Sequence, residues 1–281
     1  MTNSAGSKLG RRISGIVLAI FTLIWMFPLV WMFFMSFKTN SEIYAAPLSL
    51  PQHLNLDNFA RALETLNIGR MYVNTLIVAV LSVGLGFLVT FLSSYALCRM
   101  VFRNKRLQRG LLRFFQLGLM ISPFILLFPI YRITVQGNLY NSIWSLVLPY
   151  IATQVSFNTL LMYNFFKGLP AEIEEAALID GCNLPQLLGR VILPMTKPVV
   201  VTVIVFNVLY VWNEYPIASV LLRDENMYTL SMGASMFKGA YSVDNAGIIA
   251  ASVLIIVPEL IFYGFLQRYI VDGMVAGAVK G

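Results

Sequence analysis

The sequence EAALIDG at residues 175–181, followed by VILP at residues 191–194, lies between two long apolar runs of this 281-residue chain. The runs cover residues 143–166 and 198–222, and each is long enough to cross a bilayer core, which needs about 20 apolar residues in a helix. The connection between them, 167–197, is long for a loop between two membrane spans. It therefore predicts a folded surface outside the bilayer.

This connection has the pattern of two short helices, 171–180 and 184–193, joined by a turn at Gly181, where glycine adopts positive φ at little cost. Four residues of the first helix share one face by their spacing, namely Ile173, Ala176, Ala177 and Asp180. The two small side chains let another surface approach closely. A protein-docking surface is one interpretation, and an amphipathic loop lying on the membrane is the other.

The composition places most of the chain in lipid. Hydrophobic residues make up 58% of the sequence and charged residues 12%, which is too apolar for a soluble domain. We expect an all-α, polytopic membrane protein whose membrane domain, 13–267, has six transmembrane helices. The expected spans are 13–37, 72–97, 111–131, 143–166, 198–222 and 247–267.

The basic residues predict the orientation. Most of the 20 Lys and Arg residues flank the spans on the side of the two termini, and such residues concentrate in the cytoplasm. The N-terminal segment 1–12, the connection 167–197 and the tail 268–281 are therefore expected to be cytoplasmic. Segments 38–71 and 223–246 are expected to be outer loops, the first with a short amphipathic helix from residue 56 to about residue 66.

Several function classes lack support in the sequence. The net charge of +7 is distributed by membrane side and forms no nucleic-acid-binding stripe. Cys98, Cys182 and the single histidine, His53, match no metal-binding spacing. No phosphate-binding loop of the Gly-x-x-x-x-Gly-Lys-Ser/Thr type occurs. We expect no catalytic, metal or cofactor site in this chain, and any ATP hydrolysis to occur in another protein.

Five of the expected spans contain proline, at Pro28, Pro123, Pro129, Pro149, Pro216 and Pro258. Proline removes a helix hydrogen bond and favours a bend. Bent helices often enclose a pathway, although they also occur in membrane proteins without a transport role.

Polar side chains in two spans are candidates for a substrate pathway. They are Tyr150, Gln154 and Asn158 in the fourth span and Asn207, Tyr210, Trp212, Asn213 and Glu214 in the fifth. Amide, hydroxyl and aromatic groups suit a neutral sugar, but buried amides also hold membrane helices together. Glu214 is the more informative of these, and Glu259 in the sixth span is a further candidate, because ionisable groups are costly in lipid and are therefore often functional. The middle of the spans has no Lys or Arg, which disfavours this subunit as the main holder of a phosphate or carboxylate substrate, although a partner permease could supply a cation.

The loop pattern resembles the signature loop of binding-protein-dependent ABC transporter permeases. Glu175, Ala176, Ala177, Gly181, Leu193 and Pro194 match it, with Asp180 before the glycine and Val191 where the family usually has Ile. Asn141-Ser142 and Trp212-Asn213-Glu214 are similar to the second permease subunit of maltose-type carbohydrate importers. The resemblance covers essentially the whole chain.

This resemblance implies the permease fold of type I ABC importers in a bacterial or archaeal cytoplasmic membrane. It implies a heterodimer with a second permease, two ATPase subunits that bind ATP and Mg, and an external solute-binding protein. Residues 175–181 would insert into a cleft of the ATPase, and residues 274–280 would lie between the ATPase subunits.

We therefore interpret the chain as a non-enzymatic permease subunit for a mono-, di- or oligosaccharide. One alternative is a proton- or ion-coupled transporter or channel without an ATPase, in which Glu214 and Glu259 relay protons. Another is an ABC importer of a different polar solute, such as glycerol phosphate. A membrane scaffold without a substrate path is the third.

Overall fold

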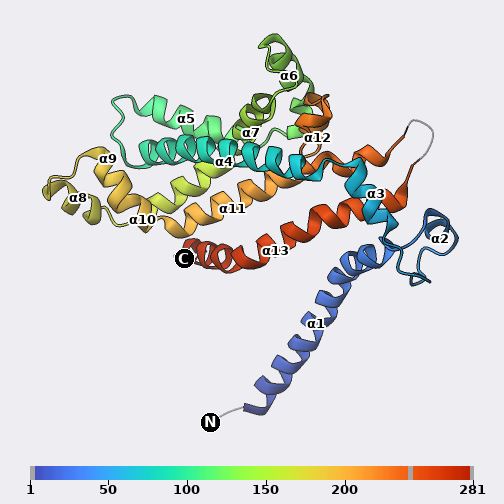
Figure 1. Cartoon of the computed structure of the whole chain (residues 1–281). Coiled ribbons are helices and arrows are strands. Elements are labelled where there is room, and N and C mark those ends of the chain that lie inside the picture. The colour runs from blue at the N-terminus through green and yellow to red at the C-terminus, as the bar shows by residue number, and fades with distance from the viewer. Residues whose placement is uncertain (1–3, 240–242, 279–281) are drawn as a thin grey trace. The chain divides into compact units, whose positions relative to one another are not determined.

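The computed structural model describes residues 4–239 and 243–278, and these residues are overwhelmingly helical (Figure 1). The α-helices are α1 (Ser4–Met35), α2 (Asn40–Ala45), α3 (Asp57–Thr65), α4 (Ile68–Arg99), α5 (Lys105–Gly118), α6 (Pro123–Gln136), α7 (Ile143–Lys167), α8 (Glu172–Ile179), α9 (Leu184–Gln186), α10 (Leu193–Met195), α11 (Lys197–Asn213), α12 (Pro216–Leu221) and α13 (Asn245–Ala278). A π-helical segment covers Leu187–Ile192, and 3₁₀ helices cover Glu225–Met227 and Leu230–Phe237. The all-α prediction is confirmed.

The described residues contain four helices long and apolar enough to cross a membrane, or six if each of two bent helix pairs counts as one span. The four are Gly10–Met35, Ile68–Arg99, Ile143–Lys167 and Asn245–Phe265. The helix of the last span continues through the predicted tail to Ala278. Residues 279–281, which include Lys280, lie outside the described residues.

The third and fifth spans are not the continuous helices that we expected. In the third, α5 ends at Gly118 and α6 begins at Pro123, with their axes bent by 104°. In the fifth, α11 ends at Asn213 and α12 begins at Pro216. The second bent pair is a different one, Leu184–Met195 with Lys197–Asn213, whose axes are bent by 81°. Proline lacks an N–H and disfavours helical geometry in the residue before it, so it fits best at the start of a helix.

The other four prolines lie inside helices, as predicted. They are Pro28 in α1, Pro129 in α6, Pro149 in α7 and Pro258 in α13. Proline therefore interrupts the expected spans only at Pro123 and Pro216.

The chain divides into two compact units, one formed by Met1–Asn67 with Gly233–Val257 and the other by Ile68–Met232 with Pro258–Gly281. In the second unit, α4 packs along α7, and α11 contacts both helices (Figure 1). Small polar residues lie at this contact: Ser94 donates hydrogen bonds to the carbonyls of Thr90 and Thr159. Such residues let membrane helices approach closely while their hydroxyls remain satisfied.

The first unit contains the loop predicted to lie outside. Its amphipathic helix is α3, within a residue of the prediction. Helix α2, which begins with a capping box between Thr39 and Glu42, was not predicted. Lys38 is 1% exposed, and its Nζ donates to the carbonyls of Ala46 and Ser49 and to the Ser49 hydroxyl. This buried ammonium group holds the loop around itself.

Candidate functional sites: a helix–turn–helix loop and a pocket

The segment from α8 to α10 has the predicted helix–turn–helix form. Helix α8 ends at Ile179, and Gly181 has a φ of +81°. Asn183 then caps α9 by accepting a hydrogen bond from the Gln186 N–H, while the Gln186 side chain accepts one from the Asn183 N–H. The positive φ explains the glycine, because most other residues are strained in this conformation.

The two alanines of α8 do not share a face, so that part of the prediction is wrong. Ala177 is buried in an apolar cluster that includes Tyr95, Phe166 and Leu187, whereas Ala176 is exposed. Adjacent helix residues are about 100° apart, and in this helix the packing of the second unit occupies the side of Ala177. Ala177 therefore contributes to the protein's own core.

The other signature residues divide in the same way. Val191 and Leu193 are half-buried against the cluster, whereas Glu175, Asp180, Gly181 and Pro194 are exposed. Two large apolar side chains are also exposed at the end of α8: Leu178 at 55% and Ile179 at 87%. These two side chains were not among the predicted site residues, although apolar residues beside an acidic turn are a visible signal in the sequence.

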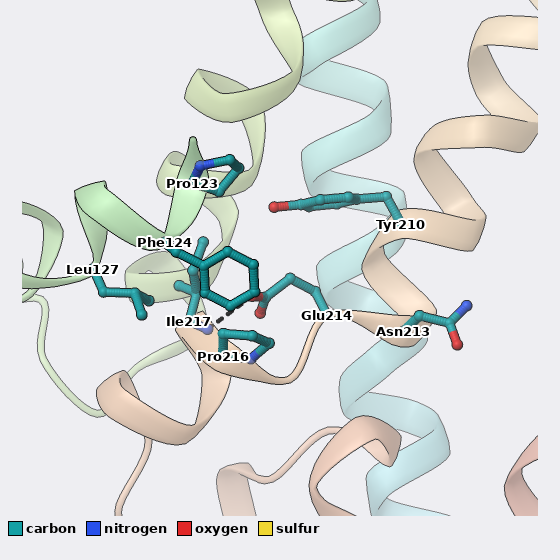
Figure 2. A pocket seen from close by; sticks show the side chains of 8 residues that line it. All are labelled: Pro123, Phe124, Leu127, Tyr210, Asn213, Glu214, Pro216 and Ile217. Carbon is teal, nitrogen blue, oxygen red and sulfur yellow. Dashed lines mark hydrogen bonds between the residues drawn. The ribbon is translucent and has the colours of Figure 1, made fainter. Parts of the chain in front are cut away.

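A pocket of about 240 Å³ lies beside the break between α11 and α12 (Figure 2). Three predicted pathway residues line it, namely Tyr210, Asn213 and Glu214. The rest of the lining was not predicted to belong to a pathway: Pro123, Phe124, Leu127, Pro216 and Ile217. The signal was present in Pro123 and Pro216, which start the helices on either side of the pocket.

Glu214 is buried at this break and fully engaged in hydrogen bonds. Its carboxylate accepts a bond of 2.7 Å from the Tyr150 hydroxyl, one of 2.7 Å from the Ile217 N–H and one of 3.1 Å from the Ala218 N–H. The two N–H groups belong to the first turn of α12, where backbone N–H groups have no acceptor within the helix. Glu214 thus joins α7 to the start of α12.

A second, much smaller cavity of about 10 Å³ is lined by most of the other predicted pathway residues. Tyr150, Gln154, Asn158 and Asn207 line it together with residues of α4. Asn158 donates a bond of 3.0 Å to the Asn207 side-chain carbonyl, and Asn207 donates to the Val203 carbonyl. Ligand pockets are typically about 300–1,000 Å³, so these amides hold α7 and α11 together and line no sugar-sized space in this structure.

Two candidate side chains close to the α11–α12 break are directed to other parts of the structure. The Asn213 amide points away from Phe124 (Figure 2) and donates to the Glu259 carboxylate of α13 at 2.5 Å. Trp212 does not line the pocket; its ring packs edge-on against Tyr72, with ring centroids 5.9 Å apart. The structure therefore places only part of the predicted set around one pocket.

Comparisons with known proteins agree with this architecture. Residues 90–275 match the family described as "Binding-protein-dependent transport system inner membrane component". The chain is 33% identical over 269 residues to the probable starch degradation products transport system permease protein AmyC of Thermoanaerobacterium thermosulfurigenes, covering 95% of this chain and 94% of the relative. It is 32% identical to the diacetylchitobiose uptake system permease protein NgcG of Streptomyces coelicolor, covering 95% and 88%.

A solved structure shares the fold. It is a bacterial ABC transporter involved in the import of the acidic polysaccharide alginate, and the match has a TM-score of 0.79 at 23% identity, covering 96% of this chain and 99% of that one. The chain belongs to the family of binding-protein-dependent transport system inner membrane components, and it has the fold of an ABC importer permease.

Proposed function

We propose that this chain is the permease subunit of an ATP-driven importer that carries a sugar across the cytoplasmic membrane. Its partners are a second permease, two ATPase subunits that bind ATP and Mg, and an external solute-binding protein. The observation that carries this proposal is the helix–turn–helix at α8–α10. Its inner side packs into the apolar cluster of the second unit, and its outer side exposes Leu178 and Ile179.

The exposed end of α8 is the proposed ATPase contact. Glu175, Asp180 and the two apolar side chains lie on one short helix followed by Gly181. Large exposed apolar residues on a structured surface favour a protein partner, and the neighbouring carboxylates can pair with basic groups of that partner. The termini and this loop then lie in the cytoplasm, in agreement with the distribution of Lys and Arg.

The pocket at the α11–α12 break is the proposed part of the sugar pathway in this subunit. Aromatic and apolar groups from Phe124, Tyr210 and Ile217 form its walls, and Asn213 and Glu214 lie at its edge. The names of AmyC and NgcG refer to starch degradation products and diacetylchitobiose, which supports a neutral saccharide as the cargo. Because about 240 Å³ is small for such a ligand, the second permease would supply the rest of the site.

A proton-coupled transporter is the weaker candidate. Glu214 already accepts hydrogen bonds from three donors, and Glu259 accepts one from Asn213. These contacts give both carboxylates a structural task that needs no proton transfer.

Reconstitution in liposomes tests the proposal. The chain alone, and the chain with the second permease, ATPase and binding protein encoded beside it, would be supplied with radiolabelled diacetylchitobiose and maltose. We expect uptake of at least one sugar that requires ATP and all partners. Flux through the chain alone driven by a proton gradient, or a complex that moves neither sugar, would contradict the proposed function.

A further inference from the structure

Arg99, the last residue of α4, connects three helices of the second unit through its guanidinium group. One nitrogen, Nη2, donates to the carbonyl of Phe166 in the last turn of α7 at 2.8 Å and to that of Leu169, two residues beyond the helix, at 2.6 Å. The Nε atom lies 2.9 Å from a carboxylate oxygen of Glu174 in α8. The other oxygen of Glu174 accepts a hydrogen bond of 2.9 Å from the Tyr95 hydroxyl of α4.

The chemistry of this group depends on arginine. A guanidinium is a rigid planar cation with several donors, so one side chain can donate to two carbonyls while its charge pairs with a carboxylate. The carbonyls at the C-terminal end of α7 carry the negative end of the helix dipole, which favours a cation there. The side chains of Arg99 and Glu174 are only 17% and 13% exposed, so water and salt screen their attraction little.

Two adjacent carboxylates in the first turn of α8 have different surroundings. Glu174 is partly buried and faces Arg99 and Tyr95, whereas Glu175 is exposed. One turn further on, Ala177 packs into the apolar cluster that contains Tyr95 and Phe166. Helix α8 is thus attached to α4 and α7 along one side and is open to a partner along another.

We propose that Arg99, Glu174 and Tyr95 form a latch that makes α8 move together with α4 and α7. The three are positioning residues: they transmit a displacement of α8 to the membrane helices. The inference rests on the proposed function, because the ATPase supplies that displacement. Without the latch, the short connection between α7 and α8 would let α8 shift while the membrane helices stay in place.

The first test measures the attachment itself and needs neither sugar nor ATPase. Spin labels at Val101→Cys and Glu172→Cys, both exposed positions, report the separation of the end of α4 from α8 once Cys98→Ser and Cys182→Ser remove the native thiols. In the full-length chain we expect one narrow distance distribution, and Arg99→Met should broaden it. Arg103→Met, which removes an exposed cation four residues further along, should not. An unchanged distribution in Arg99→Met would overturn the latch.

The second test measures coupling in the reconstituted complex, as sugar transported per ATP hydrolysed. Arg99→Met should lower this ratio about fivefold or more, the scale of ordinary coupling between sites, while the ATPase still co-purifies. The milder Tyr95→Phe should lower it less and should keep the chain folded. Equal ratios in wild type, Arg99→Met and Tyr95→Phe would contradict the latch, whereas a wild-type complex without ATP-dependent transport would contradict the proposed function.

A charge exchange separates the three-helix latch from a simple ion pair. In the double variant Arg99→Glu with Glu174→Arg, the charges are opposite again, but Glu at position 99 would face the carbonyls of Phe166 and Leu169. We therefore expect no rescue of coupling. Full rescue would show that the pair alone matters and that α7 is not part of the latch.

Discussion

The Tyr150 hydroxyl donates a hydrogen bond of 2.7 Å to Glu214, which links the first half of α7 to the break between α11 and α12. Because the same carboxylate accepts the first two free N–H groups of α12, one side chain determines where the broken span resumes. The pocket beside this break depends on the same arrangement.

Replacing Glu214 with Ala should destabilise the protein. The N–H groups of Ile217 and Ala218 and the Tyr150 hydroxyl would lose their acceptor, at a cost of about 1–3 kcal/mol for each buried group left unsatisfied. Tyr150→Phe removes only one donor and should cost about 1 kcal/mol. Thermal unfolding in detergent measures both, with Tyr263→Phe on the exposed side of α13 as the control. Equal melting temperatures for all three variants would contradict the structural role of Glu214.

The Asn158–Asn207 pair should affect stability more than substrate choice. Both side chains are buried and bond to each other, and interhelical hydrogen bonds in membranes average about 0.6 kcal/mol in double-mutant cycles. A cycle with Asn158→Ala and Asn207→Ala should give a coupling energy of this size. The relative uptake of diacetylchitobiose and maltose should remain unchanged, and a reversed preference would indicate direct contact with the sugar.

Substituting Ile179 with Asp should weaken ATPase binding without unfolding the second unit. The side chain is 87% exposed, and such surface changes usually alter stability by about 0.5 kcal/mol or less. Co-purification of the ATPase with the permease pair measures the effect, and melting of the permease pair alone provides the stability control. Wild-type co-purification would exclude this end of α8 from the contact.

Gly181→Val should impair coupling through the backbone of the turn. The φ of +81° is strained for a β-branched residue, by about 1–2 kcal/mol, although an added Cβ would meet no atom within 4 Å. Gly181→Asn is the matched variant, because asparagine tolerates this conformation better. We expect ATP-dependent uptake to fall in the valine variant and to be largely kept in the asparagine variant. Equal losses in both would point to side-chain size as the cause.

The first unit should lose stability in acid through Asp244. Burial by itself raises the pKa of this carboxyl group, but the Gly247 N–H, the Asn40 amide and the Arg61 guanidinium 3.1 Å away together lower the pKa below its ordinary value. A lowered folded-state pKa stabilises the protein above the unfolded pKa of about 3.9, and this stability is lost as the pH falls through the folded pKa.

The difference in melting temperature between wild type and Asp244→Asn measures this contribution. It should be constant near neutral pH and should shrink below about pH 4. Asp57→Asn, at an exposed carboxylate of α3, serves as the control. A difference that does not change with pH would show that the charge of Asp244 contributes nothing.

Local patterns in the sequence were sufficient for the helical class, for most apolar spans and for the turn at Gly181. A long apolar run indicates a helix buried in lipid, and a glycine at a turn indicates a positive φ. Both signals are local, because neither requires knowledge of residues far away in the chain. The signature residues of the loop predicted the family for the same reason, since they recur at fixed spacing within one segment.

Contacts between distant segments decided what the sequence left open. Proline alone does not determine whether a helix continues through it, as at Pro149, or starts anew, as at Pro216. The outcome at the second site depends on Tyr150 and Glu214, which are far apart in the chain. Likewise, Lys38 is the first residue of the expected outer loop 38–71, yet it is buried among carbonyls of that loop, which folds back over it.

The sequence by itself determined that this is a helical membrane permease with a folded loop between two spans, because hydrophobicity and backbone preference are local. Only the tertiary structure decided that Ala177 faces inward and Ile179 outward, and that Glu214 bonds to the backbone of α12. The face that a helix buries, and the partner that a buried carboxylate finds, depend on which other helices pack against it.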